Sequence, residues 1–189
     1  MEKVKGSSPL NHPKNGIRIF RPLELRSLVN AIPKLENKDK VEVLLYTGAR
    51  YSELRWLFEH QDAFKQDFIQ MPSTKPKAQF KERIIRLNNQ GKRTVANFLR
   101  SKNNLPTHIA FDEDLNRWCK LAGLDPKGVS VKAFRKTWES WLANTYPNNW
   151  LQIFLSQGHS ERTAMEYYLS LPFNADDKKD MLYYVEGWI

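Results

Sequence analysis

The chain has 189 residues, enough for one substantial hydrophobic core and too few for two full domains. Hydrophobic residues make up 41% of it and aromatic residues 12%, proportions typical of a globular chain rather than a disordered one. No apolar run approaches the roughly 20 residues that span a bilayer. The polar N-terminal stretch lacks the apolar segment of a secretion signal, and the single cysteine, Cys119, excludes an internal disulfide and a cysteine-rich metal site. We therefore expect a cytoplasmic protein with no membrane partner.

The charge of the chain is more informative. Lys and Arg outnumber Asp and Glu by 30 to 21, which gives a formal net charge of +9 at pH 7. An excess of this size favours a polyanionic partner, usually a nucleic acid, because binding releases the counterions condensed on the polymer. A basic surface that only contacts solvent is the alternative, and charge alone does not choose between the two.

In chain order, residues 1–20 carry Gly, Ser, Pro and Asn with little periodicity, which predicts a basic flexible arm before a folded domain over residues 21–189. Two short runs within the domain are typical of the strands of a hairpin with a Lys-rich tip. The hairpin strands are predicted at 67–75 and 82–88, and helices at 22–32, at 38–58 with a break at Gly48, at 91–102, 113–124, 130–145, 149–157 and 161–171, and in a C-terminal helix or tail over 175–189. Gly123 and Gly158 are placed like helix C-caps. The whole pattern predicts a mainly α architecture with one small antiparallel β-sheet, an α+β fold.

The segment 46–57, YTGARYSELRWL, places Arg50 and Glu53 three residues apart, on one face of a helix that begins just after Gly48. A surface ion pair at this spacing is the simpler interpretation. The functional interpretation is that Glu53 fixes Arg50, whose planar guanidinium then points at a phosphate.

A second group of cations lies in 130–142, SVKAFRKTWESWL, where Lys132 and Arg135 flank an apolar stripe. Two cations beside a buried face indicate a concave edge that binds an anion, although long side chains that extend along apolar surface to reach water are the common alternative. Lysines also crowd the hairpin tip, among them Lys75 and Lys77. Such a tip is usually a solvated loop, and by itself it is a weak signal for phosphate contact.

The segment 158–171, GHSERTAMEYYLSL, holds His159 and the adjacent pair Tyr167 and Tyr168. Tyr168 shares a helical stripe with apolar neighbours, so it fits a buried position, and Tyr167 lies about 100° around the same helix. Periodicity does not choose between the two rings, and on this pattern alone both are structural.

Taken in chain order, these features form a series: TGARYSEL, a hairpin bearing lysines, a helix with a cation three residues before Arg135, then GHS, then a tyrosine nine residues after His159. Over residues 21 to 184 the chain resembles the catalytic domain of tyrosine recombinases, the phage-integrase family. The resemblance implies a site-specific DNA recombinase that cuts and rejoins double-stranded DNA through a 3′-phosphotyrosine intermediate. It implies no metal and no cofactor such as ATP.

The resemblance also implies a role for each matching residue. Arg50 and Arg135 are the two arginines that bind the scissile phosphate. His159 takes the position where the family has histidine or tryptophan, after the conserved segment that holds Arg135. Tyr168, nine residues after His159, is the nucleophile.

The hairpin lysine implied by the resemblance is Lys75, from the Thr-Lys pair, with Lys77 as its competitor because this tip is longer than usual. Glu53 is a further candidate member of the site. One departure concerns Lys132, which stands where the family pattern has histidine. In having lysine at that position the chain resembles the integrases of archaeal viruses and plasmids of the fusellovirus type. We therefore prefer these integrases as its relatives over bacterial or eukaryotic ones.

Two alternatives share much of this pattern: a type IB topoisomerase-like enzyme that relaxes DNA, and a catalytically inactive DNA-binding module with the same fold. We expect self-association on DNA as a dimer or tetramer, and the apolar face of 175–189 either packs on its own domain or docks on an adjacent protomer.

The sequence leaves open the target DNA, the balance of integration and excision, and whether cleavage occurs in cis or in trans. It also leaves open whether an N-terminal DNA-binding domain precedes this one in a longer protein.

Overall fold

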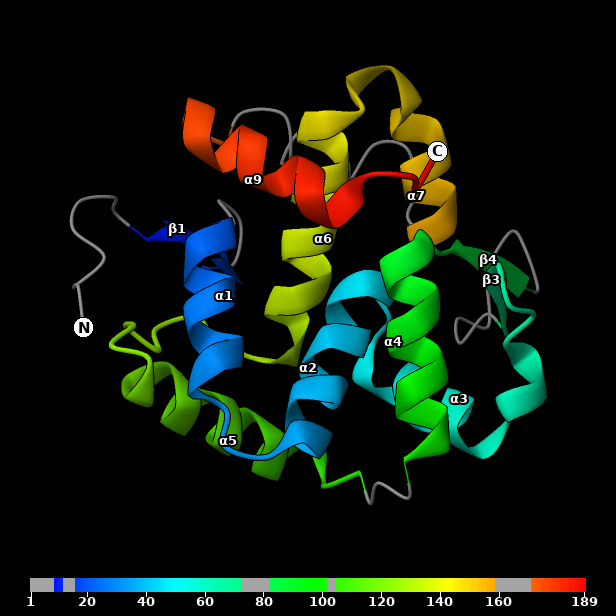
Figure 1. Ribbon diagram of the computed structural model, residues 1–189, viewed down its shortest axis with the longest axis horizontal. Coiled ribbons are helices and arrows are strands. Elements are labelled where there is room, and N and C mark those ends of the chain that lie inside the picture. The colour runs from blue at the N-terminus through cyan, green and yellow to red at the C-terminus, as the bar shows by residue number, and fades with distance from the viewer. Residues whose placement is uncertain (1–8, 12–15, 73–81, 102–104, 159–170) are drawn as a thin grey trace.

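The computed structural model describes residues 9–11, 16–72, 82–101, 105–158 and 171–189 (Figure 1). The strands form two antiparallel pairs: β1 (Leu10–Asn11) with β2 (Arg18–Ile19), and β3 (Phe68–Pro72) with β4 (Glu82–Arg86). The helices are α1 (Pro22–Ala31), α2 (Leu35–Thr47), α3 (Tyr51–Glu59), α4 (Asn89–Arg100), α5 (His108–Leu121), α6 (Val131–Thr145), α7 (Trp150–Gln157) and α9 (Ala175–Val185), with short 3-10 turns at Gln61–Ala63 and Pro147–Asn149. The predicted α+β class is confirmed, with two small sheets in place of one.

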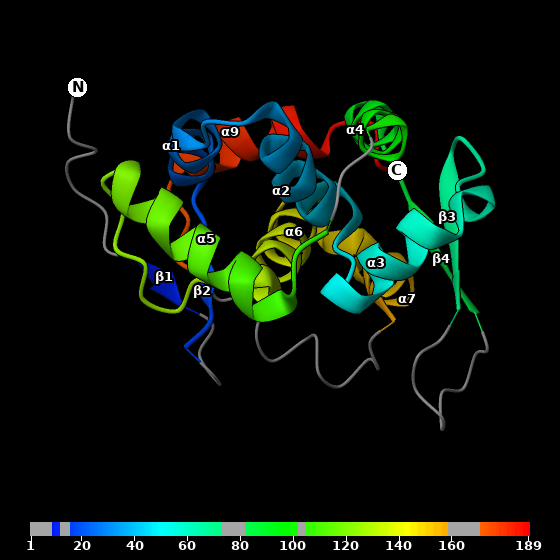
Figure 2. The same ribbon diagram turned by 90° about the horizontal axis from the view of Figure 1, so that it is seen from below.

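Helix α6 forms the centre of the domain, and α2, α5, α7, α9 and β2 all pack against it (Figures 1 and 2). Most of its residues are buried, and polar ones such as Thr137, Glu139 and Ser140 are among them. Trp138 and Trp141 are fully buried, and the Trp138 ring meets that of Tyr46 edge to face at 5.6 Å between centroids. Loss of a core aromatic ring typically costs about 3–5 kcal/mol, so this helix is a rigid base for the side chains that it carries. No helix in the described ranges is long and apolar enough to cross a membrane.

The described part of the N-terminal segment is packed into this core. Ile19 and Phe20 are fully buried, the Phe20 amide donates to the Thr137 hydroxyl at 2.9 Å, and the Trp141 indole donates to the Phe20 carbonyl at 3.0 Å. Arg18 is also buried, and it pairs with Glu24 at 2.6 Å. Residues 9–11 and 16–20 thus belong to the packed domain, in contrast to the flexible arm expected for them. Residues 1–8 and 12–15 of that arm lie outside the described residues, and the division of the chain at residue 20 stays a prediction.

The predicted hairpin is confirmed in β3 and β4, whose register runs from Phe68 opposite Arg86 to Pro72 opposite Glu82. Inward and outward residues alternate along both strands, as the two-residue period of a half-buried sheet requires. The tip, residues 73–81, lies outside the described residues, and Lys75 and Lys77 are in it.

The C-terminal segment packs on its own domain. Met181, Val185 and Trp188 are buried, and the Trp188 indole donates to the Arg86 carbonyl at 3.2 Å. The Asn88 side chain donates to the Tyr184 carbonyl at 2.7 Å, which joins the end of α9 to the start of α4. Within the apolar face of this segment Val185 and Trp188 pack on their own domain, whereas Leu182, Tyr183 and Ile189 are exposed. Docking on an adjacent protomer and self-association on DNA therefore stay predictions.

Candidate active site

Arg50 is placed by the break between α2 and α3. Helix α2 ends at Gly48 in a left-handed conformation (φ 55°), and Arg50 is the N-cap residue of α3. The Glu53 carboxylate accepts the Arg50 backbone amide at 2.7 Å and the Arg50 guanidinium at 2.6 Å, so one side chain fixes both the backbone and the head group of Arg50. Glu53 is only 1% exposed, whereas the Arg50 side chain remains 31% exposed. The predicted pair is therefore not a surface ion pair: its anion is buried, and its cation reaches the surface.

Arg135 reaches the same region from α6. Its guanidinium donates to the Gly48 carbonyl at 2.8 Å and to the Gln157 carbonyl, and its Nε lies 3.2 Å from the Glu139 carboxylate. The side chain is buried, so these contacts are made in a medium of low dielectric constant, where charged hydrogen bonds are strong. Arg135 thus joins the ends of α2 and α7.

Lys132 lies one turn before Arg135, in the first turn of α6, and its side chain is exposed. The two cations predicted to flank the apolar stripe therefore differ: the arginine is held inside the domain, and the lysine extends into solvent. For Lys132, but not for Arg135, this agrees with the alternative of a long side chain that extends along apolar surface to reach water.

Three further predicted residues, His159, Tyr168 and the alternative tyrosine Tyr167, lie in 159–170, outside the described residues, as do Lys75 and Lys77 in the hairpin tip. Helix α7 ends at Gln157, and Gly158 follows in a left-handed conformation (φ 67°), as its predicted C-cap position requires. The described chain thus reaches the residue directly before His159.

A charged residue beside Glu53 that the sequence patterns did not single out is Arg83 on β4. Its guanidinium pairs with Glu53 at 2.5 Å and donates to the Ser156 carbonyl, and the residue is 9% exposed. Burial lowers the pKa of Arg83 to about 10, although the attraction of Glu53 opposes this change. The sequence did hold a signal: Arg83 is in phase with Ile85 and Leu87 on the inward face of the strand.

The electrostatic centre of the site is the buried Glu53 carboxylate. Burial by itself acts to raise the pKa of Glu53, but Arg83 and the Arg50 backbone amide act in the opposite direction and are joined by the guanidiniums of Arg50 and Arg135. The net effect is a pKa below the ordinary value of a glutamate. Glu53 is therefore ionised at neutral pH and organises three arginines from three different elements around one anion.

Close packing at Gly48 accompanies this arrangement. A Cβ atom at position 48 would lie 2.3 Å from the Gln157 Oε1 atom, and the Gln157 side chain is fully buried. A side chain at position 48 would therefore require the buried amide group of Gln157 to move, in addition to adopting the left-handed conformation.

We expect Gly48→Ala to lower the free energy of unfolding by about 2–5 kcal/mol, the sum of a left-handed backbone and an overpacked contact. Gly123→Ala is the matched control, because Gly123 has a similar conformation (φ 72°) and nothing within 4 Å of an added Cβ. It should lose only about 1–2 kcal/mol. Urea denaturation of both variants measures the difference, and equal losses would contradict the packing argument.

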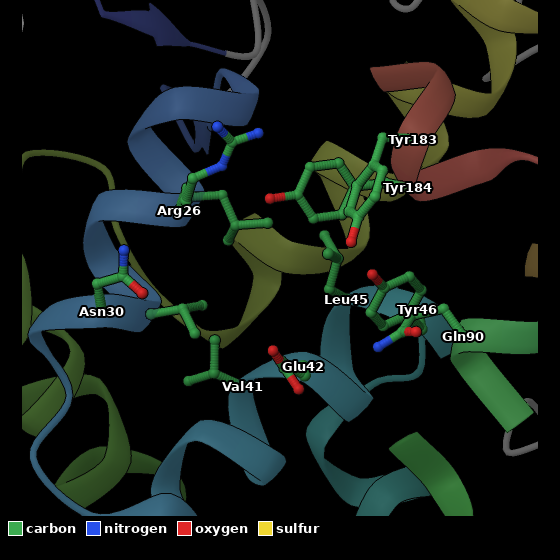
Figure 3. Close-up of a pocket in the computed structure, with 11 residues that line it drawn as sticks. Arg26, Asn30, Val41, Glu42, Leu45, Tyr46, Gln90, Tyr183 and Tyr184 are labelled. Atoms are coloured by element: carbon green, nitrogen blue, oxygen red, sulfur yellow. The ribbon is translucent and has the colours of Figure 1, made fainter. Parts of the chain in front are cut away.

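The structure also has a cavity of about 230 Å³ among α1, α2, α4 and α9, lined in part by Arg26, Glu42, Tyr46 and Tyr184 (Figure 3). Burial, with the nearby Asp39, raises the pKa of Glu42. Of the predicted site residues that the structure describes, none lines this cavity. The candidate active site instead lies where α3, α7 and β4 come together, at the end of the domain away from β1 and α1 (Figure 2).

The sequence matches no protein-family model and none of the curated protein sequences. Among solved structures, the fold is similar to a crystal structure of XerA recombinase, with a TM-score of 0.63 and 19% sequence identity over 97% of this chain and 67% of that one. It is also similar to the Tn1549 transposon integrase (residues 82–397) in complex with circular intermediate DNA, with a TM-score of 0.64 and 19% identity over 96% of this chain and 68% of that one. The chain therefore adopts the fold of tyrosine recombinase catalytic domains, as its sequence predicts.

Proposed function

We propose that the protein is a site-specific DNA recombinase of the integrase type, which cuts and rejoins double-stranded DNA through a 3′-phosphotyrosine on Tyr168. The observation that carries the proposal is the meeting of Arg50 and Arg135, from α3 and α6, beside the end of α7 that leads to His159. The net charge of +9 is consistent with a DNA partner. The fold, shared with a recombinase and with an integrase in complex with DNA, supports the same conclusion.

The proposed chemistry begins with the charge of the phosphodiester, which repels a nucleophile. Guanidiniums from Arg50 and Arg135 on the non-bridging oxygens neutralise that charge and stabilise the pentavalent transition state. A tyrosine has an unperturbed pKa of about 10, so Tyr168 needs cationic neighbours or a base to attack at neutral pH. Lys132 and His159 are the additional cations of this proposal.

The leaving 5′ oxygen needs a proton, and the hairpin lysine, Lys75 or its competitor Lys77, is the proposed general acid. The products are a 3′-phosphotyrosine and a free 5′-hydroxyl. Because the covalent link conserves the energy of the broken bond, a 5′-hydroxyl from a second duplex can reverse the step on another strand. Strand exchange by this route uses no metal and no ATP.

Lys132 enters the proposal mainly as a charge. A histidine with a pKa near 6.5 exchanges protons at neutral pH, whereas a lysine near 10.4 stays protonated. Its exposed position on the first turn of α6 leaves the ammonium accessible to a phosphate. The same lysine supports the proposed kinship with integrases of the fusellovirus type.

The decisive test is to trap the covalent intermediate. The protein is incubated, in the presence of a chelator, with a nicked duplex library randomised around the nick, so that the short 5′-hydroxyl strand leaves after cleavage. We expect a denaturant-resistant protein–DNA adduct, and sequencing of the trapped DNA then gives the target. DNA binding without an adduct would support the inactive module, and relaxation of supercoiled DNA without joining of two duplexes would support the topoisomerase.

A further inference from the structure

Arg83 lies on the strand that follows the hairpin tip, opposite Met71 and on the inward face of the sheet. A buried guanidinium is costly to desolvate, so each of its contacts is a constraint on the surrounding fold. Even with its lowered pKa of about 10, Arg83 remains charged at neutral pH. Both of its Nη atoms contact protein groups, the Ser156 carbonyl and the Glu53 carboxylate.

The contacts of Arg83 form a chain that leads to Arg50. Arg83 Nη2 lies 2.5 Å from Glu53 Oε2, and Glu53 Oε1 lies 2.6 Å from Arg50 Nη1. The Arg50 backbone amide shares Glu53 Oε2 with Arg83, at 2.7 Å. Arg83 thus contacts one oxygen of the Glu53 carboxylate, and the Arg50 guanidinium contacts the other, so the orientation of the carboxylate links the two arginines.

A second contact joins Arg83 to the end of α7. Arg83 donates to the Ser156 carbonyl, and Arg135 donates to the next carbonyl, that of Gln157. Carbonyls in the last turn of a helix carry partial negative charge and have no partner within the helix, so cations there are stabilising. A Cβ atom at Gly158 would lie 3.0 Å from the Arg83 Cδ atom, so the chain is also closely packed at this point.

We propose that Arg83 is a positioning residue: by holding Glu53 and the end of α7 together, it orients the Arg50 guanidinium toward the scissile phosphate. The proposal rests on the proposed function. A role in stability alone does not account for these contacts, because a buried ion pair is often no more stabilising than apolar side chains of similar volume. The planar guanidinium contacts the Glu53 carboxylate and the Ser156 carbonyl at once, and this double contact fixes the orientation of the carboxylate.

The test compares Arg83→Met, which keeps much of the side-chain volume, with Arg83→Lys and with Arg18→Met. Arg18 is the matched control, because Arg18 and Glu24 form another buried ion pair, at 2.6 Å, among elements away from the site. Single-turnover cleavage is measured under conditions in which circular dichroism shows all variants folded. We expect Arg83→Met to cleave about 10- to 100-fold more slowly, Arg83→Lys to recover only part of that loss, and Arg18→Met to cleave at the wild-type rate. DNA affinity should change less than about threefold in all three, because phosphate positioning acts in the transition state.

A substrate with sulfur at the 5′ bridging position separates Arg50 from the hairpin lysine. A thiol, with a pKa of about 8.5, leaves without a proton donor, so this substrate restores cleavage to variants that lack the general acid. We expect the Arg83→Met defect to persist on it. Recovery to the wild-type rate would show that Arg83 acts through the hairpin tip, and a defect no larger than that of Arg18→Met would show a purely structural role. Either result overturns the proposal.

Nuclear magnetic resonance of the arginine side chains tests the same contact without DNA. Rotation of the Arg50 guanidinium should be slow in the wild type and in Arg18→Met, and fast in Arg83→Met; the Arg50 signal is assigned by its loss in Arg50→Lys. Slow rotation that survives in Arg83→Met overturns the proposal even when cleavage is never observed. A wild type that forms no adduct would contradict the proposed function, while this measurement would still decide the role of Arg83.

Discussion

Tyr168→Phe is expected to fold and to bind DNA like the wild type and to form no covalent adduct. Phenylalanine keeps the ring and removes only the hydroxyl, which in the proposed mechanism is the atom that attacks phosphorus. The loss should be complete within the range of the assay, because attack by water in place of the phenol would not yield a protein–DNA bond. A denaturing gel of the nicked substrate measures the adduct, and a filter-binding assay measures affinity.

Tyr167→Phe is the matched control for that variant. In the helix predicted over 161–171, adjacent residues would point about 100° apart, so only one of the two phenols would face a given phosphate. Tyr167→Phe should still form the adduct, and peptide mapping of the wild-type complex should place the nucleotide on Tyr168. An adduct that survives Tyr168→Phe and disappears in Tyr167→Phe would exchange the two assignments without changing the enzyme class. If both variants keep the adduct, the recombinase proposal fails.

Arg50→Ala is expected to slow cleavage by about 100- to 1000-fold, the usual cost of removing one donor that stabilises a transition-state oxyanion. Stability should fall by about 1 kcal/mol or less, because the Arg50 side chain is partly exposed and Glu53 keeps its contact with Arg83. Arg50→Lys should recover little activity, since an ammonium cannot reproduce the planar fork of the guanidinium. A lysine variant that cleaves at close to the wild-type rate would show that Arg50 does not clamp the phosphate.

Arg135→Ala should reduce cleavage to a similar extent and differ in its effect on stability. Arg135 is buried and pairs with the fully buried Glu139, so its removal should destabilise the fold by up to about 3–5 kcal/mol. Thermal denaturation beside single-turnover kinetics separates the two arginines. Equal stability in both variants would contradict the burial described for Arg135.

Local features of the site could be predicted from the sequence because they depend on neighbours in the chain. Gly48 marks the end of α2, and the three-residue spacing of Arg50 and Glu53 places them together on α3. The hairpin strands follow from their alternation, although the apolar pattern did not show that an arginine, Arg83, occupies an inward position. A charged residue in phase with Ile85 and Leu87 was the available signal.

Contacts between distant segments could not be predicted in this way. Nothing near Arg135 in the sequence indicates that it donates to the carbonyls of Gly48 and Gln157, because those contacts depend on how α2, α6 and α7 pack. The β1–β2 pair was missed for a related reason. Two strands of two residues each have too short a pattern to recognise, and they are held by the contacts of Phe20 with α6 rather than by their own periodicity.

The position of Phe20 also matters for protein engineering. A module cut at Arg21, where the helical pattern begins, would lack the ring that packs on Phe134 and both backbone partners of Thr137 and Trp141. A buried donor or acceptor left without a partner typically costs about 1–3 kcal/mol. A transplantable module therefore has to retain the chain from Leu10 onward, and a foreign DNA-recognition domain is best joined ahead of that residue. The β1–β2 pair, attached to α6 through Phe20, would then lie between the grafted domain and the core.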